Sequence, residues 1–364
     1  MTRPLIARID LAALAHNLGV ARKAAPHSKV LAVVKANAYG HGLTRSVRAL
    51  RTADGFAVLR LEEAEQLRSE GYTHPLVLLE GFFQPDELTE IARLRLRPVI
   101  HRVDQAEILA KARLPQRVDI LLKLNTGMNR LGINPNRLAE TLATLRAAPH
   151  IASITLMTHF ACADEAEEAE KANKTTRVEQ QLACFQAANA AFNLPASLAN
   201  SAATLRYPQS HAEWVRPGIM LYGLSPFAEY TGEEIGLLPV MSLTSQLISV
   251  QSVRRGEAVG YGARFVAEHD MRVGIVACGY ADGYPRHANT GTPIRVAGTL
   301  TRTLGRVSMD MLHVDLTNVP SAHVGSPVTL WGVGLPAEQV AAAAGTIAYE
   351  LVTALSARVS IEEY

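Results

Sequence analysis

The sequence predicts an α/β protein with an N-terminal (β/α)8 barrel of the TIM type followed by a C-terminal, mainly β domain. Three observations lead to this fold class. Short apolar runs alternate with longer amphipathic stretches from residue 30 to about 222, eight such runs can be counted, and after residue 237 β-branched segments are broken by Gly and Pro. The 364 residues, 48% of them hydrophobic, can also form two cores. We therefore place a barrel domain at residues 1–236 and a β-domain at residues 237–364.

The apolar runs are the expected barrel strands. They are Val30–Val34, Gly55–Leu59, Pro75–Leu79, Arg97–Ile100, Val118–Leu124, Ile154–Thr158, Ala196–Ala199 and Trp214–Leu221. The amphipathic stretches predict helices at Leu11–Ala25 with Asp10 as its N-cap, Glu62–Glu70, Asp86–Arg95, Asp104–Arg113, Pro135–Ala147 and Glu165–Phe192. The β-domain is expected to contain strands at Ser242–Val253, Arg272–Cys278, Pro293–Val296 and Pro327–Trp331, followed by a helix at Pro336–Ala343.

Composition excludes several classes of protein. The net charge is only +2 and the basic residues form no stripe, so we expect a small-molecule substrate and no nucleic-acid partner. The N-terminus carries charges where a signal peptide is apolar, and no apolar segment approaches the ~18 residues of a membrane span, which predicts a cytoplasmic protein without membrane contact. The three cysteines have no paired spacing, so neither a disulfide framework nor a metal site is expected.

Unusual polar residues stand at the same end of five predicted strands. They are Lys35, Lys123 with Asn125, His159, Asn200 with Ser201, and Arg216 with Gly218. In a (β/α)8 barrel the active site lies at the C-terminal ends of the strands, so these residues are expected to meet there. Lys35 is the most informative, because an amine at the end of a buried strand is partly desolvated. Desolvation lowers its pKa and favours Schiff-base or proton-transfer chemistry.

The segment AVVKANAYGHG around Lys35 resembles the cofactor-lysine motif of the alanine racemases, which use pyridoxal phosphate (PLP) on a barrel plus β-domain scaffold. Further segments resemble other motifs of this family in the same order along nearly the whole chain. These segments are LKLNTGMNRLG (122–132), MTHF (157–160), ANSAATL (199–205), RPGIMLYG (216–223), VGYGARF (259–265), GYADGYPR (279–286) and VSMD (307–310).

The resemblance implies a two-base mechanism. Lys35 would form the internal aldimine with PLP, the substrate would displace it to give the external aldimine, and the released Lys35 amine would remove the α-proton of the D-enantiomer. Tyr261 would act on the L-enantiomer from the partner subunit, which implies a homodimer with shared active sites. A tyrosine in a strand more often only covers a sheet, so this role rests on the motif match.

The resemblance also assigns the binding residues. Arg216 would face the pyridine nitrogen and His159 would orient Arg216, while the phosphate would be bound by Tyr39, Ser201, Gly218 and Ile219. Arg130 would hold the substrate carboxylate, Met309 of the partner would contribute its backbone N–H, and Tyr280 would narrow the entrance. A guanidinium accepts no hydrogen bond, so the pyridine should stay unprotonated, which favours proton return to Cα over transamination.

Two positions, Asn125 and Ala357, depart from the family pattern, and a third, Lys123, is expected to be modified. Lys123 stands where relatives often carry a carbamylated lysine, so we expect the same modification, although Asn125 replaces a common aspartate. Near the C-terminus, LSARV places Ala357 where some relatives have a phosphate-contacting tyrosine, so the phosphate site is predicted to be less complete or to use water.

The activity implied by the resemblance is the interconversion of L- and D-alanine, supplying D-alanine for peptidoglycan. A racemase of broader specificity that also accepts serine, or a catabolic alanine racemase, is an alternative. A PLP decarboxylase of the same architecture is disfavoured by Arg216, because in such a decarboxylase the pyridine nitrogen meets a carboxylate and not a cation. A non-catalytic PLP carrier is disfavoured by the long C-terminal region.

Overall fold

The computed structural model describes residues 3–165 and 176–364, and it contains a closed barrel of eight parallel strands. Each of the eight predicted runs contributes one strand, which confirms the predicted barrel. The strands are β2 (Lys29–Val33), β3 (Gly55–Val58), β4 (Leu76–Leu78), β5 (Leu96–Ile100), β6 (Val118–Lys123), β7 (Ile151–Met157), β8 (Ala196–Ser197) and β9 (Trp214–Val215). Pairing of Lys29 with Trp214 and of Val30 with Val215 closes the barrel between β2 and β9.

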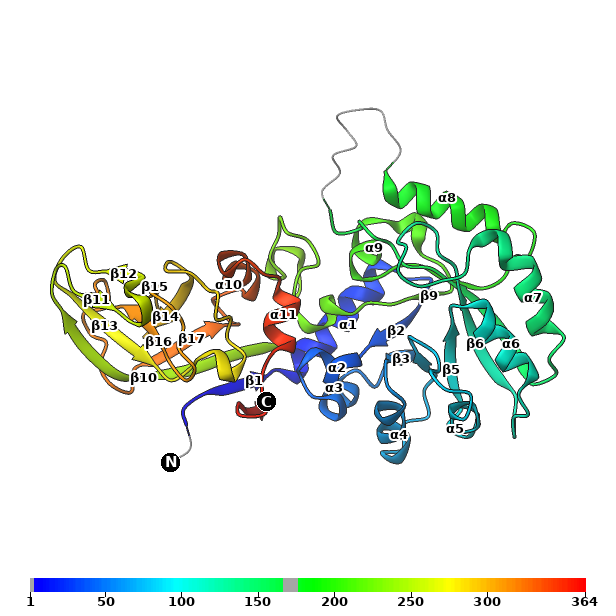
Figure 1. Ribbon diagram of the computed structural model, residues 1–364, viewed down its shortest axis with the longest axis horizontal. Coiled ribbons are helices and arrows are strands. Elements are labelled where there is room, and N and C mark those ends of the chain that lie inside the picture. Colours follow the sequence, from blue (N-terminus) through cyan, green and yellow to red (C-terminus); the bar gives the residue numbers. More distant parts are fainter. Residues whose placement is uncertain (1–2, 166–175) are drawn as a thin grey trace.

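Helices pack around the barrel, as Figure 1 shows for the right-hand lobe. They are α1 (Leu11–Ala24), α3 (Leu43–Ala49), α4 (Leu61–Ser69), α5 (Glu87–Arg93), α6 (Val103–Lys111), α7 (Leu138–Arg146), α8 (Arg177–Asn189) and α9 (Ser201–Arg206). Asp10 caps α1 as predicted, because its carboxylate accepts a hydrogen bond from the Ala13 amide at 2.9 Å. The helix predicted from Glu165 begins at Arg177 in the structure, capped by Thr176, and residues 166–175 lie outside the described residues.

The second lobe is an eight-stranded sheet with the order β13-β16-β15-β14-β17-β10-β1-β18 and an additional β13–β10 pairing. The four predicted strands correspond to β10 (Met241–Val253), β13 (Met271–Val276), β14 (Pro293–Val296) and β17 (Pro327–Trp331). The structure adds strands that the sequence did not predict: β1 (Ile6–Ile9), β15 (Thr299–Leu304), β16 (Leu312–Asp315) and β18 (Ser360–Glu363). A separate two-stranded ribbon joins β11 (Ala258–Val259) and β12 (Phe265–Val266).

Strand β1 belongs to the sheet of the β-domain, although it lies within the range that the sequence assigns to the barrel. It pairs antiparallel with β10 and parallel with β18, so both ends of the chain are hydrogen-bonded into one sheet. The helices α10 (Ala337–Ala344) and α11 (Ala348–Thr353) follow β17, and α11 lies between the two lobes (Figure 1).

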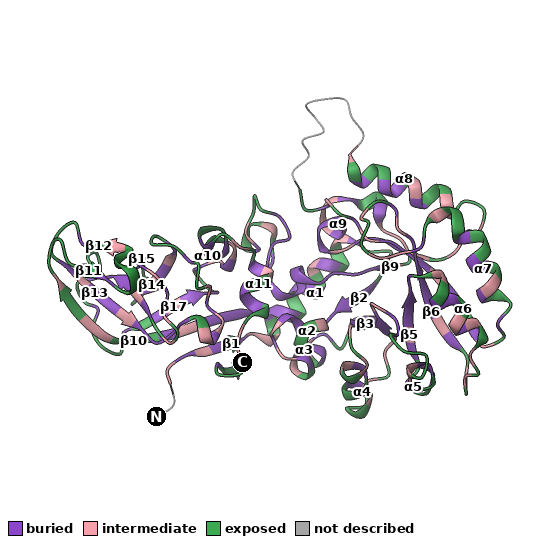
Figure 2. Cartoon of the chain, in the orientation of Figure 1, coloured by how far each residue is buried: buried purple, intermediate pink, exposed green. Residues whose placement is uncertain are grey.

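A single hydrophobic cluster extends from the barrel into the β-domain and includes Phe56, Tyr222, Tyr284 and Trp331, each buried. Buried residues accordingly follow the strands through both lobes in Figure 2. Continuous packing of this kind fixes the β-domain relative to the barrel mouth. Among the described residues, no helix has the length and apolar character needed to cross a membrane.

Candidate active site

A cavity of about 870 Å³ lies at the C-terminal ends of the barrel strands. Seven polar side chains that follow or end different strands line it. They are Lys35, Glu80, His101, Lys123, His159, Ser201 and Arg216. Such a concave site with a few convergent polar groups is typical of a small-molecule binding site.

The structure brings most of the predicted site residues into this cavity. The lining includes Lys35, Tyr39, Lys123, Arg130, His159, Ser201, Arg216, Gly218 and Ile219. Tyr261, Tyr280 and Met309 are absent from the lining residues of the described chain and lie on the β-domain, with exposed fractions of 69%, 37% and 52%. Their exposure is consistent with roles in a second subunit, which the resemblance implies.

Lys35 begins a short turn, α2 (Lys35–Tyr39), that has the left-handed helical conformation. The four residues Ala36 to Tyr39 have φ between 52° and 55°. This conformation costs roughly 1–2 kcal/mol per non-glycine residue, so it needs local support. The Asn37 side chain accepts a hydrogen bond from the Leu43 amide at 2.8 Å, and His41 Nδ1 lies 2.9 Å from the Tyr39 carbonyl oxygen. These contacts hold the turn in place and fix the position of Tyr39 relative to Lys35.

A stack of aromatic rings packs against the turn. The ring centroids of Tyr39 and Tyr222 are 4.8 Å apart, and those of His41 and Tyr222 are 4.6 Å apart. The Tyr222 hydroxyl donates to the Val33 carbonyl at 2.9 Å, which ties the stack to strand β2. Complete burial lowers the pKa of His41 to about 4, so this imidazole is neutral and serves the packing.

The two lysines of the cavity are held with lowered pKa values. Burial lowers the pKa of Lys35, and the charge of Arg130 adds to this effect, while Glu80 and Glu63 oppose it. Burial also lowers the pKa of Lys123 to about 8, helped by the charges of Arg216 and Arg130. A lowered pKa increases the fraction of neutral, nucleophilic amine at neutral pH.

Arg216 presents a fully buried guanidinium whose donors are largely satisfied by the barrel. It donates to Ser197 Oγ at 2.7 Å, and to the carbonyl oxygens of Thr158 at 2.7 Å and Leu198 at 3.0 Å. Burial lowers the pKa of Arg216 to about 9, which still leaves it charged at neutral pH. His159 Nδ1 lies 3.3 Å from Arg216 Nη2, and desolvation followed by the Arg216 charge lowers the pKa of His159 well below its ordinary value. The neutral imidazole therefore accepts a hydrogen bond from Arg216.

Ser201, Gly218 and Tyr39 give the cavity donors suited to a phosphate group. Ser201 Oγ accepts hydrogen bonds from the amides of Gly218 at 2.8 Å and Met220 at 3.4 Å. A Cβ atom at Gly218 would lie 2.5 Å from the Tyr39 hydroxyl, so only glycine leaves this cradle open. Burial raises the pKa of Tyr39 to about 12, which keeps the phenol protonated and able to donate. Hydroxyl and backbone donors with a nearby lysine amine fit a phosphorylated aldehyde such as PLP.

Several lining residues were missed at the sequence level, among them Glu80, His101 and Tyr349. His101 directly follows β5 and Glu80 lies two residues after the end of β4, so the rule that identified the other strand-end residues would also have identified them. Tyr349, from α11, also lines the cavity, with its ring centroid 6.3 Å from that of Tyr39. Ala357 is exposed and lies outside the lining, so the expectation that this position belongs to the site is wrong, and another residue of the C-terminal region, Tyr349, lines the cavity.

Comparisons with known proteins agree along the whole chain. Family models described as the N-terminal and C-terminal domains of alanine racemase match residues 9–226 and 240–362. The chain is similar to the alanine racemases of Nitrosospira multiformis, at 54% identity over 98% of this chain and 99% of that protein, and of Nitrosomonas eutropha, at 56% identity over 99% and 98%. It also superimposes on the biosynthetic alanine racemase from Pseudomonas aeruginosa with a TM-score of 0.95 and 47% identity, covering 100% of both chains.

Proposed function

Because this chain belongs to the alanine racemase family, we propose that it interconverts L-alanine and D-alanine with Lys35 and Tyr261 as the two bases and with PLP as cofactor. The observation that carries the proposal is the buried guanidinium of Arg216 in the same cavity as Lys35. Set against the pyridine nitrogen, a guanidinium offers only donors and keeps that nitrogen unprotonated. A decarboxylase, which needs a carboxylate at this place, is disfavoured by the same observation.

The residues of one chain are sufficient to hold the cofactor. Lys35 would bind its aldehyde, and Tyr39, Ser201 and the backbone of Gly218 and Ile219 would bind its phosphate. Tyr349 is a further candidate for the phosphate, since it lies beside Tyr39. When bound, PLP supplies an electron sink that makes the α-proton of an amino acid more acidic.

The protein groups then move the proton between the two faces of Cα. Lys35, whose pKa is lowered by burial, removes or returns it on the face that gives D-alanine. Tyr261 of a second subunit acts on the other face, so the enzyme is proposed to work as a homodimer. Arg130 would bind the substrate carboxylate, while Tyr280 and the backbone N–H of Met309, both from the second subunit, would limit the site to small amino acids.

Lys123 is proposed to carry a carbamate. Its lowered pKa of about 8 favours reaction with carbon dioxide, and the product would place an anion near Arg130 and Arg216. Such an anion would orient Arg130 for the substrate. We further propose that the enzyme acts in the cytoplasm and supplies D-alanine for peptidoglycan, a role that complementation of a D-alanine auxotroph would test.

The central test follows L-alanine in deuterated water by chiral chromatography and mass spectrometry. We expect D-alanine labelled at Cα, without release of carbon dioxide, and a visible absorption band of the bound cofactor. Lys35→Ala should abolish both, whereas Lys29→Ala, at an exposed lysine that pairs with Glu213 at 2.7 Å, should change neither. Release of carbon dioxide, or a band that survives Lys35→Ala, would contradict the proposal. A panel of other L-amino acids in the same assay shows whether serine is accepted.

A further inference from the structure

Two loops of the β-domain that carry Tyr280 and Met309 are joined by backbone hydrogen bonds. The Tyr280 amide donates to the Ser308 carbonyl at 3.0 Å, and the Ala281 amide donates to the Met309 carbonyl at 3.0 Å. The loops approach so closely that a Cβ atom at Gly279 would lie 2.3 Å from the Met309 carbonyl oxygen. Tyr280 and Met309 therefore have a common support, and a displacement of one loop displaces the other.

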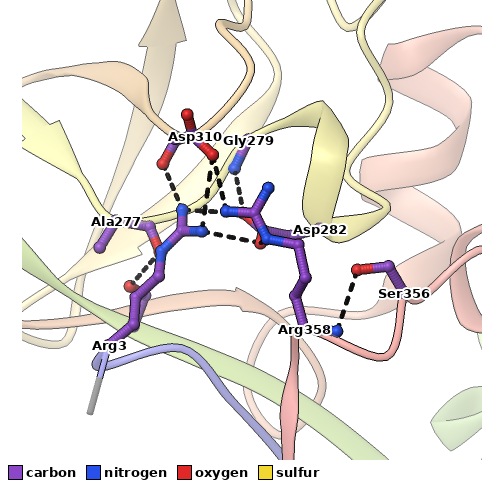
Figure 3. A network of polar contacts seen from close by, with 8 residues as sticks. Arg3, Ala277, Gly279, Asp282, Asp310, Ser356 and Arg358 are labelled. Atoms are coloured by element: carbon purple, nitrogen blue, oxygen red, sulfur yellow. Dashed lines mark hydrogen bonds and ion pairs between the residues drawn. The ribbon is translucent and has the colours of Figure 1, made fainter.

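The turn that carries Tyr280 also contains a buried carboxylate, that of Asp282. Its Oδ2 accepts a hydrogen bond from the Gly279 amide at 2.9 Å, which closes the turn that presents Tyr280. Arg3 contacts both carboxylate oxygens, with Nη1 to Oδ1 and Nη2 to Oδ2 each at 2.8 Å. Arg358 approaches from the C-terminal segment, with Nε 3.4 Å from Oδ1. A buried carboxylate thus receives two guanidinium groups from opposite ends of the chain (Figure 3).

The same two arginines reach the second loop. Arg358 Nη2 donates to Asp310 Oδ1 at 2.6 Å, and Arg3 Nη2 donates to the Asp310 backbone carbonyl. Asp310 directly follows Met309, so these contacts bridge the Tyr280 loop to the Met309 loop (Figure 3). We call Arg3, Asp282, Asp310 and Arg358 the terminal clamp. Its two positive and two negative charges balance.

Stability alone is a weak explanation for this arrangement. Only Asp282 is fully buried, while the Arg3 and Arg358 side chains are 28% and 45% exposed, and ion pairs of either kind often contribute little to stability. The hydrogen bonds of the clamp do, however, restrict geometry, since the planar, forked guanidinium can donate to a carboxylate only from a narrow range of positions. The clamp fixes the two loops whose large side chains, Tyr280 and Met309, are exposed in the single chain. This exposure points to a role of the clamp in contacts outside its own chain.

We propose that the terminal clamp positions Tyr280 and Met309 for the active site of the partner subunit. This inference rests on the proposed shared site. The four clamp residues touch no substrate in this scheme and act through the loops that they hold, so they are positioning residues. Loosening them should weaken substrate binding in the partner subunit and leave the cavity of the same chain intact.

Hybrid dimers test the direction of this effect. A Lys35→Ala chain combined with a Tyr261→Phe chain forms only one complete site, which uses Lys35 of the second chain and the loops of the first. Arg358→Gln is placed either on the Lys35→Ala chain or on the Tyr261→Phe chain. The two hybrids then have the same composition and the same number of broken contacts, so a general loss of stability affects both equally.

We expect Arg358→Gln on the Lys35→Ala chain to lower kcat/KM for alanine about tenfold, mainly through KM, because small misplacements of binding groups have large effects. On the Tyr261→Phe chain the value should stay within about twofold of the unsubstituted hybrid. Equal kcat/KM values for the two placements would overturn the clamp proposal and leave the proposed shared site standing. An inactive unsubstituted hybrid would refute the shared site, and the clamp proposal with it.

A second measurement is independent of activity and cofactor. In the homodimer, Arg358→Gln should accelerate hydrogen exchange at the amides of Gly279, Tyr280 and Ala281. The matched control is Arg302→Gln, which breaks another arginine–aspartate pair of the same domain, Arg302 Nε to Asp315 Oδ2 at 3.1 Å, with a similar side-chain exposure of 50% against 45% for Arg358. Exchange at these amides that is equally fast in both variants would also overturn the proposal.

Discussion

At the scale of single residues, the proposed carbamylation of Lys123 depends on its surroundings. Burial, with the charges of Arg216 and Arg130, lowers its pKa to about 8. Carbon dioxide reacts only with the neutral amine. About a tenth of the Lys123 side chains are neutral at pH 7, and the neutral form becomes the major one above pH 8. At constant dissolved carbon dioxide, carbamylation of Lys123 should therefore increase from about pH 6.5 to about pH 8.5.

The measurement for this prediction is the carbamate signal in the 13C NMR spectrum of protein under 13C-labelled carbon dioxide. Lys123→Arg keeps the positive charge and should remove the signal. Lys29→Arg, at an exposed lysine of the barrel, should retain it. A signal that is unaffected by Lys123→Arg, or that decreases with rising pH, would place the modification elsewhere or show that Lys123 is unmodified.

At the scale of elements, the left-handed turn after β2 depends on close packing against α11. Gly40 ends the turn with φ of 82°, and a Cβ atom there would lie 2.0 Å from the Val352 carbonyl oxygen of α11. Gly40→Ala should therefore displace α11 or the turn, weaken cofactor binding more than tenfold and lower the unfolding temperature. Gly71→Ala is the control, since Gly71 has φ of 87° but no atom within 4 Å of a Cβ.

Fluorescence titration of the apoprotein with PLP and thermal unfolding measure these effects. Gly71→Ala should lose only about 1 kcal/mol of stability from its backbone conformation and should bind PLP normally. Equal behaviour of the two variants would mean that the contact between the turn and α11 does not determine the shape of the phosphate site.

The elements also show which parts of the site the sequence can predict. Strand ends could be located because a parallel barrel gathers all of them at one mouth, so Lys35, His159 and Arg216 were placed from local patterns alone. The left-handed turn could not be predicted, because Ala36, Ala38 and Tyr39 have no local preference for positive φ and only Asn37 tolerates it well, so tertiary contacts impose it. Tyr349 was missed for a similar reason, since no local pattern shows that a helix of the second domain reaches the barrel cavity.

The same distinction applies to the sheet of the β-domain. Strand β1 has only four residues and pairs with β10 and β18, its partners more than two hundred positions away in sequence, so its apolar pattern gave no sign of its partners. The terminal clamp was equally hidden, because it forms only when both ends of the chain enter one sheet. Local periodicity predicts elements, and long-range pairing decides which side chains meet.

At the scale of the whole molecule, the proposed shared site divides binding and catalysis between subunits. Lys35, Tyr39, Ser201 and Arg216 line one cavity of a single chain, while Tyr261 lies on the β-domain with 69% of its surface exposed. A monomer should therefore bind PLP and still lack the second base. On dilution, the specific racemase activity should fall in proportion to the fraction of dimer, whereas the visible band of the bound cofactor should persist.

Activity assays from micromolar to picomolar protein, with the dimer fraction measured by mass photometry over its accessible range, test this division. Saturating PLP in all samples separates loss of the dimer from loss of the cofactor, because mass action would otherwise release PLP at low protein concentration. A monomer with full activity would show that one chain supplies both bases. A monomer that loses the cofactor band at saturating PLP would show that the second subunit also completes the phosphate site, which the cradle of Tyr39, Ser201 and Gly218 argues against.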